Sequence, residues 1–295
     1  MSRPVLLLAL ACSGCLAHHS GPMPDEPDAT YATLLDTRVR YDVRGQGPAV
    51  LLIHGFASAL ETWRTVVPAL EADYTVIRLD LKGFGWTDRP EGDYSPEAQA
   101  AICLALLDKL GVRSAAVVGH SWGASVALAV ALAAPERVSK LVLYDAWAYA
   151  EQLPSFFWWS RTPGLGESLF WLFYKQRAED RIAMAFYDQR YVTQDFVDAI
   201  EAALERPATV AGALEAARGQ HYEELAPQYK TIAAPTLLLW GREDKVSPPW
   251  VGERLQNELP NARLETFGQC GHFPMIESVH ASNRALRDFL VAVTP

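Results

Sequence analysis

The residues of this 295-residue chain that are best placed for chemistry are Gly119-His120-Ser121-Trp122-Gly123. They stand where a short apolar run, Ser114 to Val118, gives way to an Ala-rich segment with a helical pattern. A sharp strand-to-helix turn strains its central residue, and only small flanking residues such as Gly119 and Gly123 can pass close to neighbouring elements. Such a turn exposes the Ser121 hydroxyl near the helix N-terminus, where backbone N–H groups stabilise negative charge. The motif therefore predicts a catalytic nucleophile, rather than a Gly-Ser turn without chemistry.

A nucleophilic serine needs a histidine base, and the histidine needs a carboxylate that fixes its tautomer and stabilises its cation. The sequence supplies both after apolar runs. Asp244 follows the run 236–240, and His272 follows the run 263–267. Because parallel strands deliver their C-terminal loops to one edge of a sheet, we expect Ser121, Asp244 and His272 on the same side.

The composition indicates a folded α/β protein. The chain is 50% hydrophobic and 21% charged, so it can bury the core of one sizeable domain, with or without an insertion. A formal net charge of −9 and a pI near 5.3 argue against nucleic acid or an anionic membrane surface as the main partner. The sequence has no Cys/His cluster with metal-ligand spacing and no Gly-x-Gly-x-x-Gly at a strand-to-helix turn, so no metal or organic cofactor is expected. Cys103 and Cys270 are expected to be buried free thiols.

Apolar runs alternate with helical patterns along most of the chain. A run that is apolar throughout, such as Ala49 to Ile53, is what a strand buried on both faces requires. The other expected strands are 38–43, 74–79, 115–118, 138–144, 235–240 and 263–267, and the expected helices are 61–71, 96–110, 121–134, 248–259 and 279–293. This order predicts an α/β fold with a mainly parallel, twisted sheet flanked by helices on both faces.

The alternation stops between residues 146 and 230, where aromatic residues gather and no buried strand is expected. We therefore expect an inserted helical cap over 146–230 and a core made of 30–145 and 231–295. Aromatic clusters fill cores, and over a nucleophile they also form apolar pockets for ligands. Contact of residues 156–159 with a membrane is a third interpretation. The residues predicted to line a substrate pocket are Trp147, Phe156, Phe157, Trp158, Phe170 and Phe273.

The N-terminus has a pattern that is typical of a targeting segment. Its apolar stretch, Val5 to Ala11, is too short to span a bilayer and is typical of a signal peptide. Small residues just before Cys15 resemble the lipobox of bacterial lipoproteins, although Cys12 stands where a lipobox usually has Leu. We therefore expect residues 1–15 to be a signal peptide with a lipobox, and residues 16–29, rich in Pro and Gly, to be a flexible tether.

These predictions place the mature protein outside the cytoplasm. Lipid attached to Cys15 would anchor it to the bacterial cell envelope, which makes a membrane a partner of the chain. An ordinary signal peptide, cleaved near Ala17, is the alternative and predicts a secreted or periplasmic protein.

Taken together, the motifs resemble the α/β-hydrolase fold superfamily, with the order Ser, Asp, His and a cap between the serine and acid segments. The resemblance covers nearly all of residues 30–295. Outside the three loops that carry chemistry, it is strongest at His54-Gly55-Phe56 and at Asp80-Leu81-Lys82-Gly83-Phe84-Gly85. It implies an oxyanion hole formed by the backbone N–H groups of Phe56 and Trp122. Lys82 replaces the Pro common in its loop, which affects loop stiffness rather than chemistry.

Three carboxylates compete for the role of the acid. Asp244 is preferred, while Asp145 ends an earlier strand after which some members of the superfamily carry the acid, and Glu243 is the direct neighbour of Asp244. The residues expected to support loops rather than react are His54, His120, Asp80 and Asp88.

The resulting prediction is a serine hydrolase that cleaves carboxylic esters of small to medium-sized apolar substrates through an acyl-enzyme. Cofactor-free haloperoxidase or perhydrolase activity, and hydrolysis of a C–C bond in dienoic ketones, use the same triad and remain alternatives. Epoxide hydrolases and haloalkane dehalogenases are disfavoured, because they carry an Asp nucleophile in place of Ser121. The alternative without catalysis is a lipid-anchored binding protein with an inactive hydrolase shell.

Overall fold

A computed structural model describes residues 23–176 and 178–292 and contains an eight-stranded sheet with the order β1-β2-β4-β3-β5-β6-β7-β8. The strands are β1 Thr30–Leu34, β2 Thr37–Arg44, β3 Ala49–Ile53, β4 Thr75–Leu79, β5 Ala115–His120, β6 Val138–Tyr144, β7 Thr236–Gly241 and β8 Ala262–Phe267. The pairs β1–β2 and β2–β4 are antiparallel, and the pairs from β4 to β8 are parallel. The predicted α/β class with a mainly parallel sheet is confirmed.

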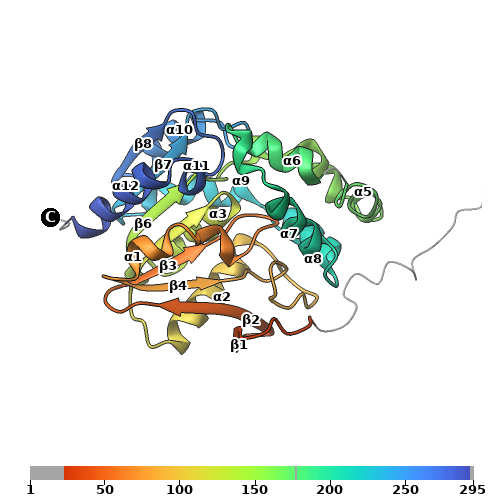
Figure 1. Cartoon of the computed structure of the whole chain (residues 1–295), viewed down its shortest axis with the longest axis horizontal. Coiled ribbons are helices and arrows are strands. Elements are labelled where there is room, and N and C mark those ends of the chain that lie inside the picture. The colour runs from red at the N-terminus through yellow and green to blue at the C-terminus, as the bar shows by residue number, and fades with distance from the viewer. Residues whose placement is uncertain (1–22, 177, 293–295) are drawn as a thin grey trace, which may run out of the picture.

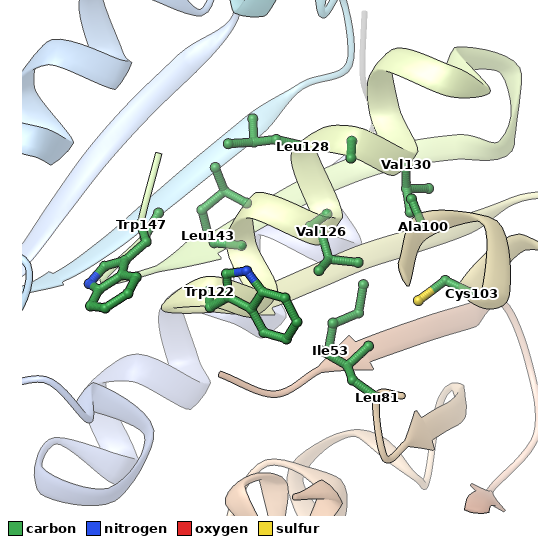
Figure 2. Packing of buried hydrophobic residues seen from close by; sticks show 14 of the residues in the cluster. Ile53, Leu81, Ala100, Cys103, Trp122, Val126, Leu128, Val130, Leu143 and Trp147 are labelled. Carbon is green, nitrogen blue, oxygen red and sulfur yellow. The ribbon is translucent and has the colours of Figure 1, made fainter. Parts of the chain in front are cut away.

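Helices cover both faces of this sheet. The elements outside the cap are η1 Leu60–Trp63, α1 Val67–Leu70, α2 Pro96–Lys109, α3 Trp122–Ala133, η2 Pro135–Arg137, α10 Trp250–Glu258, α11 Pro274–Glu277 and α12 Val279–Val291. Alternate residues of β3 point to opposite faces of the sheet. Leu51 and Ile53 pack in the core that includes α2, α3 and α10. Val50 and Leu52 pack in the core that includes α1 and α12. Figure 2 shows Trp122 and Val126 of α3 packed beside Ile53 in the first of these cores.

The structure departs from the expected elements in three places. The single helix expected over 61–71 is divided into η1 and α1, because Pro68 lacks an N–H and stands at the start of α1. The sheet gains β1, an edge strand that alternates between exposed and buried residues. The run 263–267 is not buried on both faces, since β8 is the other edge strand and pairs with β7 alone.

The segment between β6 and β7 contains helices and no strand in its described residues. Its elements are η3 Ala150–Gln152, α4 Ser155–Ser160, α5 Leu165–Phe173, α6 Ala178–Ala185, η4 Gln189–Tyr191, α7 Gln194–Leu204, α8 Thr209–Arg218, α9 Tyr222–Leu225 and η5 Ala226–Thr231. Helices α5 to α8 lie together at one end of the molecule (Figure 1). These elements lie within residues 146–231, the range over which the sequence predicts a cap, and we keep that name for the segment.

The predicted signal peptide, Cys15 and residues 16–22 of the tether lie outside the described residues, so these predictions stay open. Met23 is buried, and its sulfur accepts a hydrogen bond of 2.7 Å from Nη1 of Arg89. The last residues of the predicted tether therefore contact the core. Among the described residues, no helix has the length and apolar character needed to cross a bilayer. Cys103 and Cys270 are buried free thiols.

Asp80, at the end of β4, ties together the loops on that side of the sheet. Its carboxylate is fully buried and accepts hydrogen bonds from the backbone N–H groups of Leu60 and Trp86, both at 2.8 Å. It also accepts one from Nη1 of Arg40 at 3.2 Å. The predicted role of Asp80 as a brace for its loop agrees with these bonds.

We expect Asp80→Ala to lower the free energy of unfolding by about 3 to 5 kcal/mol, because it leaves two backbone N–H groups without their acceptor and leaves the partly buried Arg40 with Glu61 as its remaining carboxylate partner. Urea denaturation measures this change. Asp73→Ala is the matched control: Asp73 pairs with Arg287 on the surface, and its loss should cost less than about 1 kcal/mol. Equal losses in the two variants would refute the bracing role.

Candidate active site

Ser121 lies between the end of β5 and the start of α3 in a backbone conformation that a non-glycine residue rarely adopts, with φ 53° and ψ −122°. Its glycine neighbours make this turn possible. A Cβ on Gly119 would lie 2.4 Å from the carbonyl oxygen of Gly123, and one on Gly123 would lie 2.3 Å from that of His54. Such a conformation costs about 1 to 3 kcal/mol and persists only where surrounding contacts impose it.

Backbone hydrogen bonds hold this turn against β6 and the first residues of the cap. The N–H of Ser121 donates to the carbonyl of Tyr144 at 2.9 Å, and the carbonyl of Ser121 accepts from the N–H groups of Ala124 and Trp147, both at 3.0 Å. Ser121 is 5% exposed. Within the described residues its hydroxyl has no hydrogen-bond partner, and the N–H groups of Phe56 and Trp122 donate to none. The donors expected for an oxyanion hole are therefore not engaged by the chain itself.

His272 and Asp244 are brought together from the loops after β8 and β7. Nδ1 of His272 lies 2.7 Å from Oδ2 of Asp244, and both side chains are buried. The other oxygen of Asp244 accepts from the N–H groups of Val246 and Ser247 at 2.7 and 3.0 Å, which fixes the carboxylate. A carboxylate at Nδ1 favours the tautomer with the proton on that nitrogen and leaves Nε2 as the basic atom.

His120, the residue before Ser121, holds the loop that carries His272. Its Nε2–H donates to the carbonyl of His272 at 2.7 Å, and the two ring centres are 4.8 Å apart. Complete burial holds the pKa of His120 well below its usual value, so this ring stays neutral and serves as a donor. The N–H of His272 donates to the carbonyl of Ala185 in the cap at 2.7 Å. The base is thus fixed to both the core and the cap.

No hydrogen bond joins the Ser121 hydroxyl to His272 in the described part of the chain. The two residues are linked through His120, which adjoins Ser121 and contacts His272. Serine–histidine bonds in such sites are often long until a substrate is present. The arrangement supplies a serine at a helix N-terminus, a histidine oriented by a carboxylate, and two unengaged N–H groups, which is what attack on a carbonyl carbon requires.

The other two candidate acids make different contacts. Glu243 accepts from the N–H of Cys270 at 3.0 Å. Asp145, fully buried with φ 43°, accepts from the N–H of Gly241 at 2.9 Å. Burial, and next the charge of Asp244, raise the pKa of Asp145 well above its usual value. Asp145 is therefore held in its neutral form beside Asp244, and it holds the strand end from which the Asp244 loop leaves.

Three side chains of the site, Asp145, Asp244 and His272, carry atoms that bind metal ions in proteins. Single donor atoms of Asp145, Asp244 and His272 lie within 4.8 Å of one another, a group that could hold an ion. The 2.7 Å contact, however, engages Nδ1 of His272 and Oδ2 of Asp244 with each other. These residues therefore fit a hydrogen-bonded pair with an added neutral acid better than a set of metal ligands.

Aromatic side chains cover the turn at Ser121. The ring of Phe56 lies 6.1 Å from Trp122, 5.4 Å from Phe157 and 6.4 Å from Tyr174. Trp147 is 5.8 Å from Phe157. We call Phe56, Phe84, Trp122, Trp147, Phe157 and Tyr174 the aromatic cluster. Phe84 and Tyr174 were not among the predicted pocket residues, although Phe84 lies in the Gly-rich loop motif and Tyr174 in the aromatic-rich segment.

The remaining predicted pocket residues lie around this cluster or away from it. Phe170 stacks on Tyr174 at 5.5 Å and is buried. Phe273 lies 4.8 Å from the ring of His120. Phe156 is partly exposed and contacts Phe170, whereas Trp158 is exposed, with the guanidinium of Arg161 4.2 Å from its ring centre.

A cavity of about 450 Å³ lies elsewhere, between the end of the cap and α10. Tyr149, Tyr222, Arg254 and Glu258 are among its lining residues, and neither the candidate triad nor the aromatic cluster contributes to it. Its charged groups pair with one another: Arg254 bonds to Glu258 at 2.9 Å, and Tyr149 donates to Glu258 at 2.8 Å. We assign it no role in the chemistry at Ser121.

Comparison with known proteins places this geometry in a family. Residues 48–279 match the family described as alpha/beta hydrolase fold. The chain is 33% identical over 260 residues to a 2-hydroxy-6-oxo-2,4-heptadienoate hydrolase of Pseudomonas putida, with 84% of this chain and 91% of the relative covered. It is 32% identical over 268 residues to a 2-hydroxy-6-oxononadienedioate/2-hydroxy-6-oxononatrienedioate hydrolase of Paraburkholderia xenovorans, covering 86% and 91%. A solved meta-cleavage product hydrolase from Pseudomonas fluorescens is similar with a TM-score of 0.75 and 29% identity, covering 88% and 97%.

We expect Asp145→Asn to reduce the loss of folding stability that the natural chain undergoes as the pH rises. A raised pKa in the folded state means that the protonated form is favoured by folding, so the stabilisation is complete below the pKa of the unfolded chain, about 4, and declines as pH rises through the folded value. Asn keeps an oxygen for the Gly241 N–H but cannot ionise. The melting temperature of the variant, relative to the natural chain, should rise between pH 4 and pH 8. A difference that stays constant or falls over this range would show that Asp145 is not held neutral.

Proposed function

Because this chain belongs to the alpha/beta hydrolase fold family, we propose that it is a hydrolase with Ser121 as nucleophile, His272 as base and Asp244 as the acid that orients the base. The observation that carries this proposal is the contact of 2.7 Å between His272 and Asp244, on the same sheet edge as the strained turn at Ser121. An inactive shell would not require this combination of backbone strain, buried carboxylate and unengaged N–H groups.

In the proposed reaction, Oγ of Ser121 attacks the carbonyl carbon of the substrate while Nε2 of His272 takes the hydroxyl proton. The negative charge that develops on the carbonyl oxygen is stabilised by the N–H groups of Phe56 and Trp122, each worth about 3 kcal/mol. His272 then gives its proton to the leaving group, and an acyl-serine remains. Water, deprotonated by His272, hydrolyses the acyl-serine and restores the Ser121 hydroxyl.

For the bond that is broken, we propose a C–C bond next to a ketone. Support comes from the relatives at 32–33% identity, whose names describe hydrolases of 6-oxo dienoates. In a 2-hydroxy-6-oxo dienoate the leaving carbon, C5, is part of a double bond, so the compound first has to take its 2-keto tautomer, in which C5 has gained a proton. The electron pair of the broken C5–C6 bond then spreads through the C3–C4 double bond to the 2-keto oxygen, and His272 delivers the proton. This reaction was the alternative expectation from the sequence, and the relatives favour it over ester hydrolysis.

Cleavage of a carboxylic ester is the second candidate. It is favoured by the aromatic cluster itself, which consists of uncharged side chains beside Ser121 and suits an apolar acyl group. One cation near this cluster is Arg181, whose guanidinium lies 5.8 Å from the ring centre of Tyr174 and donates to the carbonyl of that residue. A carboxylate on the substrate, as the names of the relatives imply, would find its partner there. Arg181 thus separates the two candidates.

We expect the purified protein to hydrolyse 2-hydroxy-6-oxo dienoates with a kcat/KM at least tenfold above that for p-nitrophenyl esters of short to medium acyl chains. Loss of the dienone absorbance and release of p-nitrophenol follow the two reactions. Arg181→Ala should raise KM for the dienoate and leave ester hydrolysis unchanged. The reverse ranking of substrates assigns the chain to ester hydrolysis instead.

The identity of the acid is tested separately with the better substrate. Asp244→Asn should lower kcat by about two to four orders of magnitude, because the His272 tautomer and its cation lose their partner. Glu243→Gln is the matched control, since Glu243 bonds to the Cys270 N–H rather than to His272. The assignment fails if the two variants lose activity equally, or if Asp244→Asn retains full activity.

A further inference from the structure

The outer side of the cap exposes an unusual group of large apolar side chains. They come from α4 and α5 and are 39% to 64% exposed. We call this group the outer cap face; it consists of Trp158, Trp159, Leu165, Trp171, Leu172 and Phe173. Large contiguous apolar patches are rare on soluble monomers and mark contact with a protein, a ligand or a membrane.

The interior of the molecule does not account for these residues. The inward side of the same two helices is already filled by Phe157, Phe170 and Ser160, all buried. Helix α8 holds α4 and α5 through Arg218. Nε of Arg218 donates to the carbonyl of Ser160 in α4 at 2.8 Å, and its Nη2 donates to Glu167 in α5 at 2.9 Å. The helices are therefore apolar on two sides, and only the inner side has a partner within the described chain.

The described chain begins close to this end of the molecule. Met23 contacts Arg89, in the loop after β4, and the guanidinium of Arg206, between α7 and α8, lies 3.8 Å from the ring centre of Trp86 in that loop. Figure 1 shows the first described residues beside α8, the helix that also contacts α4 and α5. From Met23 back to Cys15, a fully extended chain spans at most about 29 Å.

We propose that the outer cap face lies against the surface of the lipid bilayer to which the predicted lipid on Cys15 tethers the chain. Tryptophan is the side chain most typical of the boundary between water and hydrocarbon, and this face contains three of them, Trp158, Trp159 and Trp171. A tether of that length would hold the end of the molecule at which the described chain begins towards the membrane.

Charge predicts which lipid surface would be bound. The chain has a net charge of −9, so attraction to anionic lipids cannot supply the affinity. Arg161, whose guanidinium lies over the ring of Trp158, is already engaged by the carbonyl of Gln220 and by Glu223, so it does not supply a charge for lipid phosphates. Binding should therefore arise from insertion of the apolar side chains, occur on zwitterionic vesicles and depend little on salt. Phe157 of α4 belongs to the aromatic cluster over Ser121, so this orientation also brings the site close to apolar compounds dissolved in the membrane.

The test uses the full chain with Cys15→Ser, which removes the lipid, and vesicles of phosphatidylcholine. Sedimentation with vesicles and the blue shift of tryptophan fluorescence report binding. Trp159→Gln combined with Trp171→Gln should weaken the partition constant at least tenfold, with hydrolysis in solution unchanged. Trp250→Gln is the matched control, because Trp250 is 43% exposed on α10, outside the outer cap face.

Failure to sediment with vesicles, or equal binding by the double variant and the parent chain, would overturn the proposal. So would a dimer in solution that the double variant converts to a monomer, because the face would then be an interface between copies of this chain. Should the double variant fail to fold, Leu172→Gln with Phe173→Gln provides the same comparison on the same face.

Discussion

The whole site depends on the strained turn at Ser121. A residue with φ 53° and ψ −122° has to be held by its surroundings, and here the constraint comes from the close approach of α3 to β5 and β3. Because Gly119 and Gly123 lack a Cβ, the backbone segments pass within distances that any other residue would block. The same turn bonds to β6 through its N–H and to Trp147 at the start of the cap through its carbonyl. Nucleophile, sheet and cap are therefore placed by one local geometry.

Around that turn, burial determines which groups carry charge. His54 and His120 are both enclosed, and burial lowers the pKa of each, so they stay neutral and act in fixed hydrogen bonds. His54 accepts from the N–H of Leu81 at 2.9 Å, and His120 donates to the carbonyl of His272. Only His272 among these rings has a carboxylate partner. Two buried carboxylates cannot easily be charged side by side, and the raised pKa of Asp145 makes it the one held neutral.

The sequence was a good guide wherever one local rule decides the structure. Uninterrupted apolar runs located the parallel strands, and glycines around Ser121 located the turn. The rule that parallel strands end at one edge placed His272 and Asp244 together. Edge strand β1 was missed because its residues do not form an apolar run, although it pairs with the neighbouring β2. The aromatic contacts of Phe84 and Tyr174 were missed because they depend on which distant segment packs alongside. Likewise, spacing alone could not separate the inner side of α4, with Phe157, from the outer side, with Trp158 and Trp159.

The central claim, that this turn makes Ser121 a nucleophile, is tested most directly by covalent labelling. The full chain would be treated with a fluorophosphonate, which reacts with activated serines, and the modified residue located by peptide mass spectrometry. One adduct is expected, on Ser121, and it should be lost in His272→Ala although Ser121 is still present. A folded protein that gives no adduct, an adduct on another serine, or equal labelling without the imidazole would contradict the claim.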